Sequence, residues 1–154
     1  MIDKETPLAK LLISDEGWEA SAYEDSLGWL TIGVGHLIDK RKGGRLSDNI
    51  ILSILDEDVA EKSRHLDAWL SWWRELSPPR QAVLLSMTFN MGIGNPNLGT
   101  GVLGFKRMLG ATHAKNFTAA AQNLSDSPRW RSQVGDKRVD RLCHMLETGA
   151  WPAL

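Results

Sequence analysis

The feature that most constrains the fold is a long run of apolar residues at helical spacing. Ser47 is placed to cap a helix, and apolar side chains then recur near one face. The members of that face are Ile51, Leu55, Val59, Leu66, Leu70 and Trp73. One helix of about 27 residues, at about 1.5 Å of rise per residue, would be about 40 Å long, which exceeds the diameter of a small domain. We therefore expect one helix, or two in succession, bridging two lobes of a single domain over residues 1–154.

Signals on either side of this stretch predict an α+β fold that is predominantly α-helical. Thr6 and Pro7 predict the start of a short first helix, and Gly17 predicts its end. A turn at 25–28 and alternating apolar residues after it predict a β-hairpin over 22–34. Beyond the long helix, further helices are expected over 77–91, 105–109, 115–124 and 135–147, with a glycine-rich connection over 92–104.

Composition excludes several classes of protein. Apolar residues make up 42% of the chain and charged residues 24%, which excludes wholesale disorder. The apolar runs are a few residues long, whereas a membrane span needs about 20 and a signal peptide about 7–15. We expect neither. Cys143 has no partner for an internal disulfide and no histidine at a ligand spacing, so we expect no structural metal and no cofactor.

Charge is distributed unevenly along the chain. Residues 1–79 contain 9 Lys and Arg against 15 Asp and Glu, a net charge of −6. Residues 80–154 contain 9 against 4, a net charge of +5. A basic half favours contact with an anionic polymer, either a nucleic acid or an acidic glycan. An ordinary solvated surface explains the same pattern, so charge alone does not select a partner.

Two carboxyl side chains near the N-terminus are candidates for acid–base chemistry. Glu16 ends the first helix. It follows Leu12 by four residues and Ile13 by three, so helical spacing places its side chain near the apolar face. A helix C-terminus and partial burial both disfavour the ionised form, and a general acid must hold its proton. The alternative is that Glu16 points to solvent at a fraying helix end. Asp25 lies in the following turn, where an aspartate commonly binds its own backbone. Two carboxyls in unlike surroundings are the arrangement with which glycosidases divide acid from base or nucleophile.

Strand alternation adds Thr31 to these candidates. It places Thr31 on one face of the hairpin with Trp29, Gly33 and Gly35. If that face lines a cleft, the Thr31 hydroxyl is placed to help hold a water molecule, although threonine is an ordinary strand residue. The glycines either leave room for another group to approach the backbone or mark a tight bend.

The spacing of these residues resembles that of the phage-type (T4-like) lysozymes, glycoside hydrolase family 24. It runs Glu16, eight residues, Asp25, five residues, Thr31, and then Ile-Gly-Val-Gly-His-Leu over 32–37. The similarity covers almost the whole chain and continues through Asp58-Val59, Met87–Gly92, Gly101–Phe105, Ala120–Leu124, Arg129-Trp130 and Thr148–Trp151.

The resemblance implies both a fold and an activity. The fold has a small lobe over about 15–60, a helical lobe over about 70–154 that also takes the N-terminal helix, a long joining helix and a cleft between the lobes. The activity is hydrolysis of the β-1,4 bond between N-acetylmuramic acid and N-acetylglucosamine in peptidoglycan, with inversion. Glu16 would protonate the glycosidic oxygen. Asp25 would activate water or stabilise the transition state, and Thr31 would position the water.

Further site residues are implied only by the resemblance. The substrate-binding positions are Leu37, Phe89, Asn90 and Asn123, of which Asn90 stands where some relatives carry glutamine. Two supporting ion pairs are expected, Arg138 with Glu16 and His36 with Asp58. A role in packing alone is the alternative for each substrate-binding position.

Two other functions remain open. A lytic transglycosylase cleaves the same bond but closes an anhydro ring, and Asp25 and Thr31 argue against it. A non-catalytic wall-binding protein would be marked by loss of Glu16 or Asp25, and both are present. We expect a monomeric phage or prophage endolysin that acts on the glycan strands of Gram-negative hosts, with no nucleic-acid partner and no membrane insertion. Without a signal peptide, it would stay in the host cytoplasm until a separate holin allows its release to the periplasmic cell wall.

Overall fold

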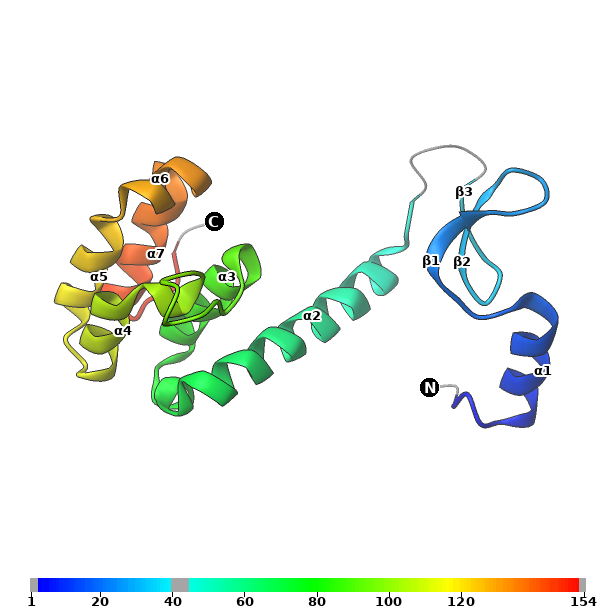
Figure 1. Cartoon of the computed structure of the whole chain (residues 1–154), viewed down its shortest axis with the longest axis horizontal. Helices are drawn as coiled ribbons and strands as arrows, with labels where there is room; N and C mark the ends of the chain where they lie inside the picture. Colours follow the sequence, from blue (N-terminus) through cyan, green and yellow to red (C-terminus); the bar gives the residue numbers. More distant parts are fainter. Residues whose placement is uncertain (1–2, 40–44, 153–154) are drawn as a thin grey trace. The chain divides into compact units, whose positions relative to one another are not determined.

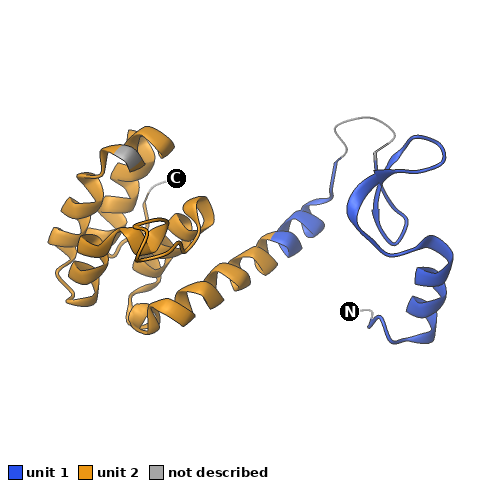
Figure 2. Ribbon diagram, viewed as in Figure 1, with its two compact units in different colours: residues 1–54 blue, residues 55–154 orange. Residues whose placement is uncertain are grey.

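The computed structural model describes residues 3–39 and 45–152 (Figure 1). Contacts between Cα atoms divide the chain into two compact units, unit 1 over residues 1–54 and unit 2 over residues 55–154 (Figure 2). The lobe bounds expected from the sequence, and the grouping of the first helix with the helical lobe, stay predictions.

Unit 1 begins with helix α1 (Pro7–Glu16), which has the ends expected from the sequence. The Thr6 side chain accepts a hydrogen bond of 3.3 Å from the backbone N–H of Ala9, as an N-cap does. Gly17, at φ 85°, ends the helix and donates its N–H to the carbonyl of Ile13 at 2.9 Å. The boundaries of α1 are therefore set by its capping residues.

A three-stranded antiparallel sheet follows in the order β1 (Glu19–Glu24), β2 (Leu30–Gly33), β3 (His36–Asp39). The first two strands form the predicted hairpin. The third strand was not predicted, because the apolar alternation was expected to continue through Val34. Instead, Gly33 at φ 70° and Gly35 at φ 64° reverse the chain, and Ile32 pairs with His36 across the turn. The structure confirms the α+β class and enlarges the hairpin to a sheet.

Helix α2 (Asp48–Trp69) is the long helix, and the boundary between the two units falls within it. It has 22 residues and is followed by a 3-10 helix over Ser71–Glu75, so the stretch through Trp73 contains two helical segments in succession and not one continuous helix. The indole N–H of Trp73 donates to Asp67 Oδ1 at 2.7 Å. The Arg74 guanidinium donates to both oxygens of the same carboxylate, at 2.9 and 3.0 Å. These bonds fold the chain back onto the last turn of α2.

Unit 2 continues with helices α3 (Pro78–Met91), α4 (Lys106–His113), α5 (Phe117–Ser125), α6 (Pro128–Val134) and α7 (Asp136–Thr148), and with a 3-10 helix over Val102–Gly104. Helix α5 packs against α4 and α7, and α7 also contacts α3 and α6. Helix α6 was not predicted. The core consists of Leu66, Leu70, Trp73, Leu76, Val83, Leu84, Met87, Val102, Leu103, Met108, Leu109, Ala120, Leu124, Trp130, Val139, Leu142, Met145 and Leu146.

Candidate active site

Glu16 is the last residue of α1, and its carboxylate lies against the turn between β2 and β3. A Cβ atom built on Gly35 would lie 2.8 Å from Glu16 Oε2 and 3.3 Å from the Glu16 Cβ and Cδ atoms. The glycine therefore leaves the room that the sequence suggested, and the group that approaches the backbone is the Glu16 side chain. Glu16 is exposed, as in the alternative that it points to solvent at the end of α1, and the partial burial expected from its apolar neighbours is not found. Leu12, one turn earlier, is itself exposed.

Asp25 occupies the turn between β1 and β2 and is fixed there by its own backbone. Its Oδ1 atom accepts the N–H groups of Leu27 at 2.8 Å and Trp29 at 2.9 Å. The Asp25 N–H donates to the Trp29 carbonyl at 2.9 Å, and the Gly28 N–H donates to the Asp25 carbonyl at the same distance. Asp25 thus has the structural role typical of a turn aspartate. The same bonds hold its carboxylate in one orientation, which a catalytic role also requires.

Thr31 lies on β2 and is buried, with 4% of its surface exposed. Its hydroxyl donates to the Trp29 carbonyl at 3.2 Å. That carbonyl also accepts the Asp25 N–H, so the backbone of Trp29 joins two of the three catalytic candidates. Sequence reasoning had treated Trp29 only as a strand neighbour. The run of turn residues after Asp25 was the available signal for this link.

The third strand brings Leu37 beside Thr31. The two residues are directly paired in the antiparallel register of β2 and β3, so their side chains stand on the same face of the sheet. Leu37 is 40% exposed. An exposed apolar side chain next to Thr31 is compatible with the expected contact to a sugar.

Unit 2 carries the remaining substrate-binding candidates. Phe89 and Asn90 are exposed in the last turn of α3. Asn123 is half-buried on α5, and its Nδ2 donates to the Ala119 carbonyl at 2.7 Å. This bond fixes the orientation of the Asn123 amide.

The supporting residues include Arg138, which lies on α7 and reaches α3. Its Nη2 donates to Ser86 Oγ at 3.0 Å and to the Ser86 carbonyl at 3.2 Å. Asp58 is half-buried on α2, and His36 is exposed on β3. The expected pairs of Arg138 with Glu16 and of His36 with Asp58 each join a residue of one unit to a residue of the other, and both stay predictions.

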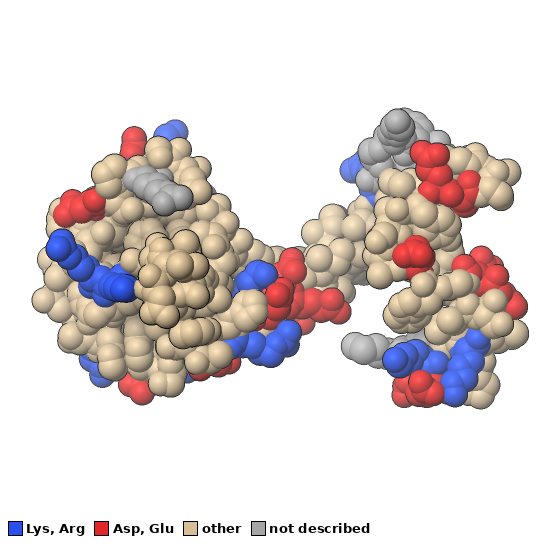
Figure 3. All heavy atoms as spheres, viewed as in Figure 1, with Lys and Arg blue, Asp and Glu red and all other residues tan. Residues whose placement is uncertain are grey.

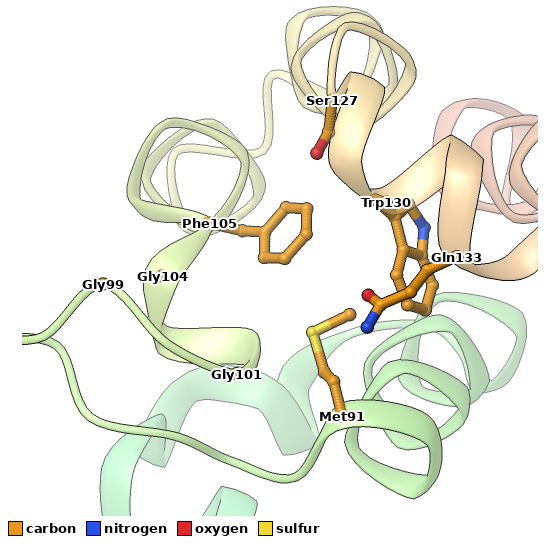
Figure 4. A pocket seen from close by; sticks show the side chains of 8 residues that line it. All are labelled: Met91, Gly99, Gly101, Gly104, Phe105, Ser127, Trp130 and Gln133. Carbon is orange, nitrogen blue, oxygen red and sulfur yellow. The ribbon is translucent and has the colours of Figure 1, made fainter.

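Two cavities in unit 2 add residues that the sequence did not single out. The first has a volume of about 390 Å³, and in Figure 4 the side chains of Met91, Phe105, Ser127 and Gln133 point towards one another around it. Its full lining is Met91, Gly99, Gly101, Gly104, Phe105, Ser127, Trp130 and Gln133.

The second cavity, of about 490 Å³, shares Gly104, Phe105 and Ser127 with the first and is also lined by Asn123. The rings of Phe105 and Trp130 meet edge to face, with centroids 6.2 Å apart. Trp130 is 1% exposed and belongs to the core of unit 2, so of the two rings only the half-buried Phe105 is open to a ligand. The signal for both residues was their place in the segments 101–105 and 129–130, which are among those that resemble the phage-type lysozymes.

Cys143 is not equipped to act as a nucleophile. It lies half-buried on α7, where its thiol donates to the Ala121 carbonyl at 3.4 Å. Burial raises the pKa of this thiol to about 11, so the reactive thiolate is scarce at neutral pH. Within residues 3–39 and 45–152, no group of three or more His, Cys, Asp and Glu side chains is arranged to hold a metal ion. No helix of the described part of the chain is long and apolar enough to cross a membrane.

Charged side chains of both signs are spread over both units (Figure 3). Part of the basic excess of residues 80–154 is neutralised by ion pairs within unit 2. Arg131 pairs with Asp136 at 2.9 Å and Asp140 at 3.0 Å, and it also donates to the Ser125 carbonyl and hydroxyl. These bonds join α5, α6 and α7, so this arginine stabilises unit 2.

Comparison with known proteins finds one family and several relatives. The sequence profile of the family described as "Phage lysozyme" matches residues 14–144. "Probable T4-type lysozyme 1" of Dictyostelium discoideum is 29% identical over 165 aligned positions, which cover 90% of this chain and 92% of that protein. "Probable T4-type lysozyme 2" of the same organism is 30% identical over 168 positions, covering 92% and 94%. The "Pre-baseplate central spike protein Gp5" of Enterobacteria phage T4 is 26% identical over 167 positions, which cover 92% of this chain and 28% of that protein.

Proposed function

The chain belongs to the phage lysozyme family, and on that premise we propose that it is a muramidase. As a member of this family it is a lysozyme-type peptidoglycan hydrolase. The bond that we propose it cleaves is the β-1,4 linkage between N-acetylmuramic acid and N-acetylglucosamine, with inversion at the anomeric carbon. The residue roles below belong to the same proposal.

Glu16 acts as the general acid. As the glycosidic bond breaks, the leaving oxygen gains negative charge and takes a proton from the Glu16 carboxyl. The side chain is exposed at the end of α1 and is backed by Gly35, so it can reach a substrate from the surface of unit 1. A carboxyl donor must come within about 2.6–3.2 Å of the leaving oxygen.

Asp25 and Thr31 handle the attacking water. Asp25 takes a proton from the water, and its negative charge stabilises the oxocarbenium-like transition state. The Thr31 hydroxyl donates its hydrogen to the Trp29 carbonyl, which leaves the lone pairs of the Thr31 oxygen to accept a hydrogen bond from water. Inversion requires that the two carboxyl groups lie about 6.5–9.5 Å apart, because the water must fit between Asp25 and the sugar.

The observation that carries this proposal is the shared backbone of Trp29. Its N–H donates a hydrogen bond that orients the Asp25 carboxylate. Its carbonyl accepts hydrogen bonds from the Asp25 N–H and the Thr31 hydroxyl. A base and a water-positioning hydroxyl held by one peptide segment keep a fixed separation. That arrangement supports hydrolysis over transglycosylation, because only hydrolysis needs a positioned water.

The test is product analysis on purified Gram-negative peptidoglycan. We expect soluble muropeptides whose masses include one added water, and whose new reducing ends are first seen by NMR as the α-anomer. Anhydro-muropeptides would instead identify a lytic transglycosylase. Binding to sacculi without any release would identify a wall-binding protein.

We also propose a biological role as an endolysin. One relative above comes from Dictyostelium discoideum, and another is a pre-baseplate central spike protein of a phage. Neither name describes an endolysin, so the role is tested separately from the chemistry. We propose a monomer that remains in the host cytoplasm until a separate holin opens the inner membrane. Expression in a Gram-negative host should leave cells intact until the membrane is permeabilised, and then lyse them within minutes. Lysis without permeabilisation would contradict this role.

A further inference from the structure

The glycines of unit 1 differ in what surrounds them. Gly17, Gly28, Gly33 and Gly35 all have positive φ, between 64° and 85°. A Cβ built on any of the first three would meet nothing within 4 Å. A Cβ on Gly35 would meet the Glu16 side chain at three atoms, with Oε2 at 2.8 Å and Cβ and Cδ at 3.3 Å.

The contact with Oε2 is too short for a real Cβ atom. Oε2 is the far end of a flexible side chain, so this contact is relieved when the carboxylate rotates away. The contacts with the Glu16 Cβ and Cδ atoms, at 3.3 Å, require those atoms to move by a few tenths of an ångström. A side chain at position 35 therefore displaces the Glu16 carboxylate and requires only a small adjustment of α1 against the turn. The main effect falls on the position of one functional group.

We propose that Gly35 is a positioning residue for the general acid, an inference that rests on the proposed function. The missing Cβ opens the place in which the Glu16 carboxylate lies against the β2–β3 turn. Helix α1 fixes one end of the Glu16 side chain, and the backbone of Gly35 limits the rotamers open to its other end.

The chemistry requires this restriction. Glutamate has three rotatable side-chain bonds, and an acid that samples many rotamers is seldom within reach of the leaving oxygen. A misplacement of about 1 Å at a reacting group costs about 100-fold in rate. Gly35 therefore acts on the chemical step through Glu16 and needs no contact with substrate.

The chain supplies a matched control for this inference. Gly33 has φ 70° against 64° for Gly35 and lies two residues earlier in the same sheet, but its Cβ position is open. Gly33→Ala and Gly35→Ala thus both place a side chain at a similar positive φ, and of the two only Gly35→Ala crowds Glu16. Asparagine tolerates positive φ better than alanine, so Gly33→Asn and Gly35→Asn serve as a second pair if an alanine variant does not fold.

The experiment compares both variants with the native enzyme on soluble peptidoglycan fragments. The same proteins, labelled with ¹³C at glutamate side chains, report the Glu16 carboxyl resonance, assigned with Glu16→Gln. We expect Gly35→Ala to lower kcat about 100-fold with KM changed less than threefold, and to shift the Glu16 resonance. We expect Gly33→Ala to show an equal drop in Tm, an unshifted Glu16 resonance, and a kcat within threefold of native.

Two results would overturn the inference. One is an unshifted Glu16 resonance in a folded Gly35→Ala or Gly35→Asn protein. The other is an equal loss of kcat in the position 33 and position 35 variants, which would reduce the effect to backbone strain. Failure of the proposed function would give a different result. The native protein itself would then release no hydrated muropeptides, while Gly35→Ala would still shift the Glu16 resonance.

Discussion

The two units of the molecule are stabilised by different means. Unit 2 has a continuous core of buried side chains contributed by its helices. In unit 1, two of the described residues, Ala9 and Thr31, are buried. Unit 1 is instead held by hydrogen bonds from backbone N–H groups to the side chains of Thr6 and Asp25. Glycines at positive φ form the turns around β2.

The difference indicates how the catalytic candidates are positioned. Glu16, Asp25 and Thr31 all lie in unit 1, and their orientation comes from helix ends and turns. Truncating a buried core side chain of unit 2 should therefore lower stability strongly. Changes at the turns of unit 1 should lower activity more than stability.

The largest effect on stability is expected in the core of unit 2. Leu84 is fully buried on α3, whereas Leu98 is 74% exposed in the connection after it. Leu84→Ala should lower the free energy of unfolding by about 2–5 kcal/mol through lost burial and the cavity left behind. Leu98→Ala, the same substitution at the surface, should change it by about 0.5 kcal/mol or less. Urea denaturation of both variants measures this. A similar loss in the two variants would contradict the description of the core.

A pair of substitutions at Asp25 separates its structural role from its chemical one. Asp25→Ala removes the acceptor of two N–H groups and should cost about 1–3 kcal/mol of stability. Asp25→Asn keeps an oxygen in that place, so its stability should stay within about 0.5 kcal/mol of native. Both should lose about 100-fold or more in hydrolysis rate, because neither carries a carboxylate. An active, stable Asp25→Asn protein would show that Asp25 is only a turn residue.

The smallest effect is expected at a surface ion pair of unit 2, and it depends on pH. Hydrogen bonds from Arg74 and then Trp73 hold the pKa of Asp67 below its usual value. A lowered folded pKa stabilises the protein above about pH 4, and this stabilisation is lost as pH falls through the folded value. Asp67→Asn should therefore have a slightly lower Tm than native at pH 7, and the difference in Tm should shrink as pH falls below about 4. A difference that does not shrink with falling pH would contradict the assignment, because protonation removes the charge that the asparagine lacks at every pH.

Capping residues and long periodic stretches made parts of the fold predictable. Thr6, Pro7 and Gly17 gave the bounds of α1, and Pro78 gave the start of α3. Capping interactions involve residues that are close in sequence, so they can be recognised without knowledge of the tertiary structure.

The features that were not predicted depend on backbone geometry and tertiary contacts that the residue pattern does not specify. Val34 continued an apolar alternation, but two glycines at positive φ turned the chain and created β3. The sequence left open whether one helix or two cover the stretch through Trp73, and hydrogen bonds from that residue and Arg74 to Asp67 favour a separate 3-10 helix there. Helix α6 was missed because seven residues show too little periodicity to be recognised.

The candidate site was predictable in part for a similar reason. Residues close in sequence, Glu16 to Leu37, lie within unit 1, where local pairing brings Thr31 beside Leu37. The contact between Glu16 and Gly35 depends on how α1 meets the sheet, and sequence spacing contains no such information. The cavity around Phe105 and Trp130 likewise depends on the packing of α6.

The most direct test of the account is the loss of activity on removing the Glu16 proton donor alone. Release of hydrated muropeptides should be compared for native protein, Glu16→Gln and Glu19→Gln, the last being an exposed glutamate on β1. We predict that Glu16→Gln loses about 100-fold or more of the rate with an unchanged Tm, and that Glu19→Gln keeps the native rate. A folded Glu16→Gln protein with the native rate would contradict the assignment of Glu16 as the general acid.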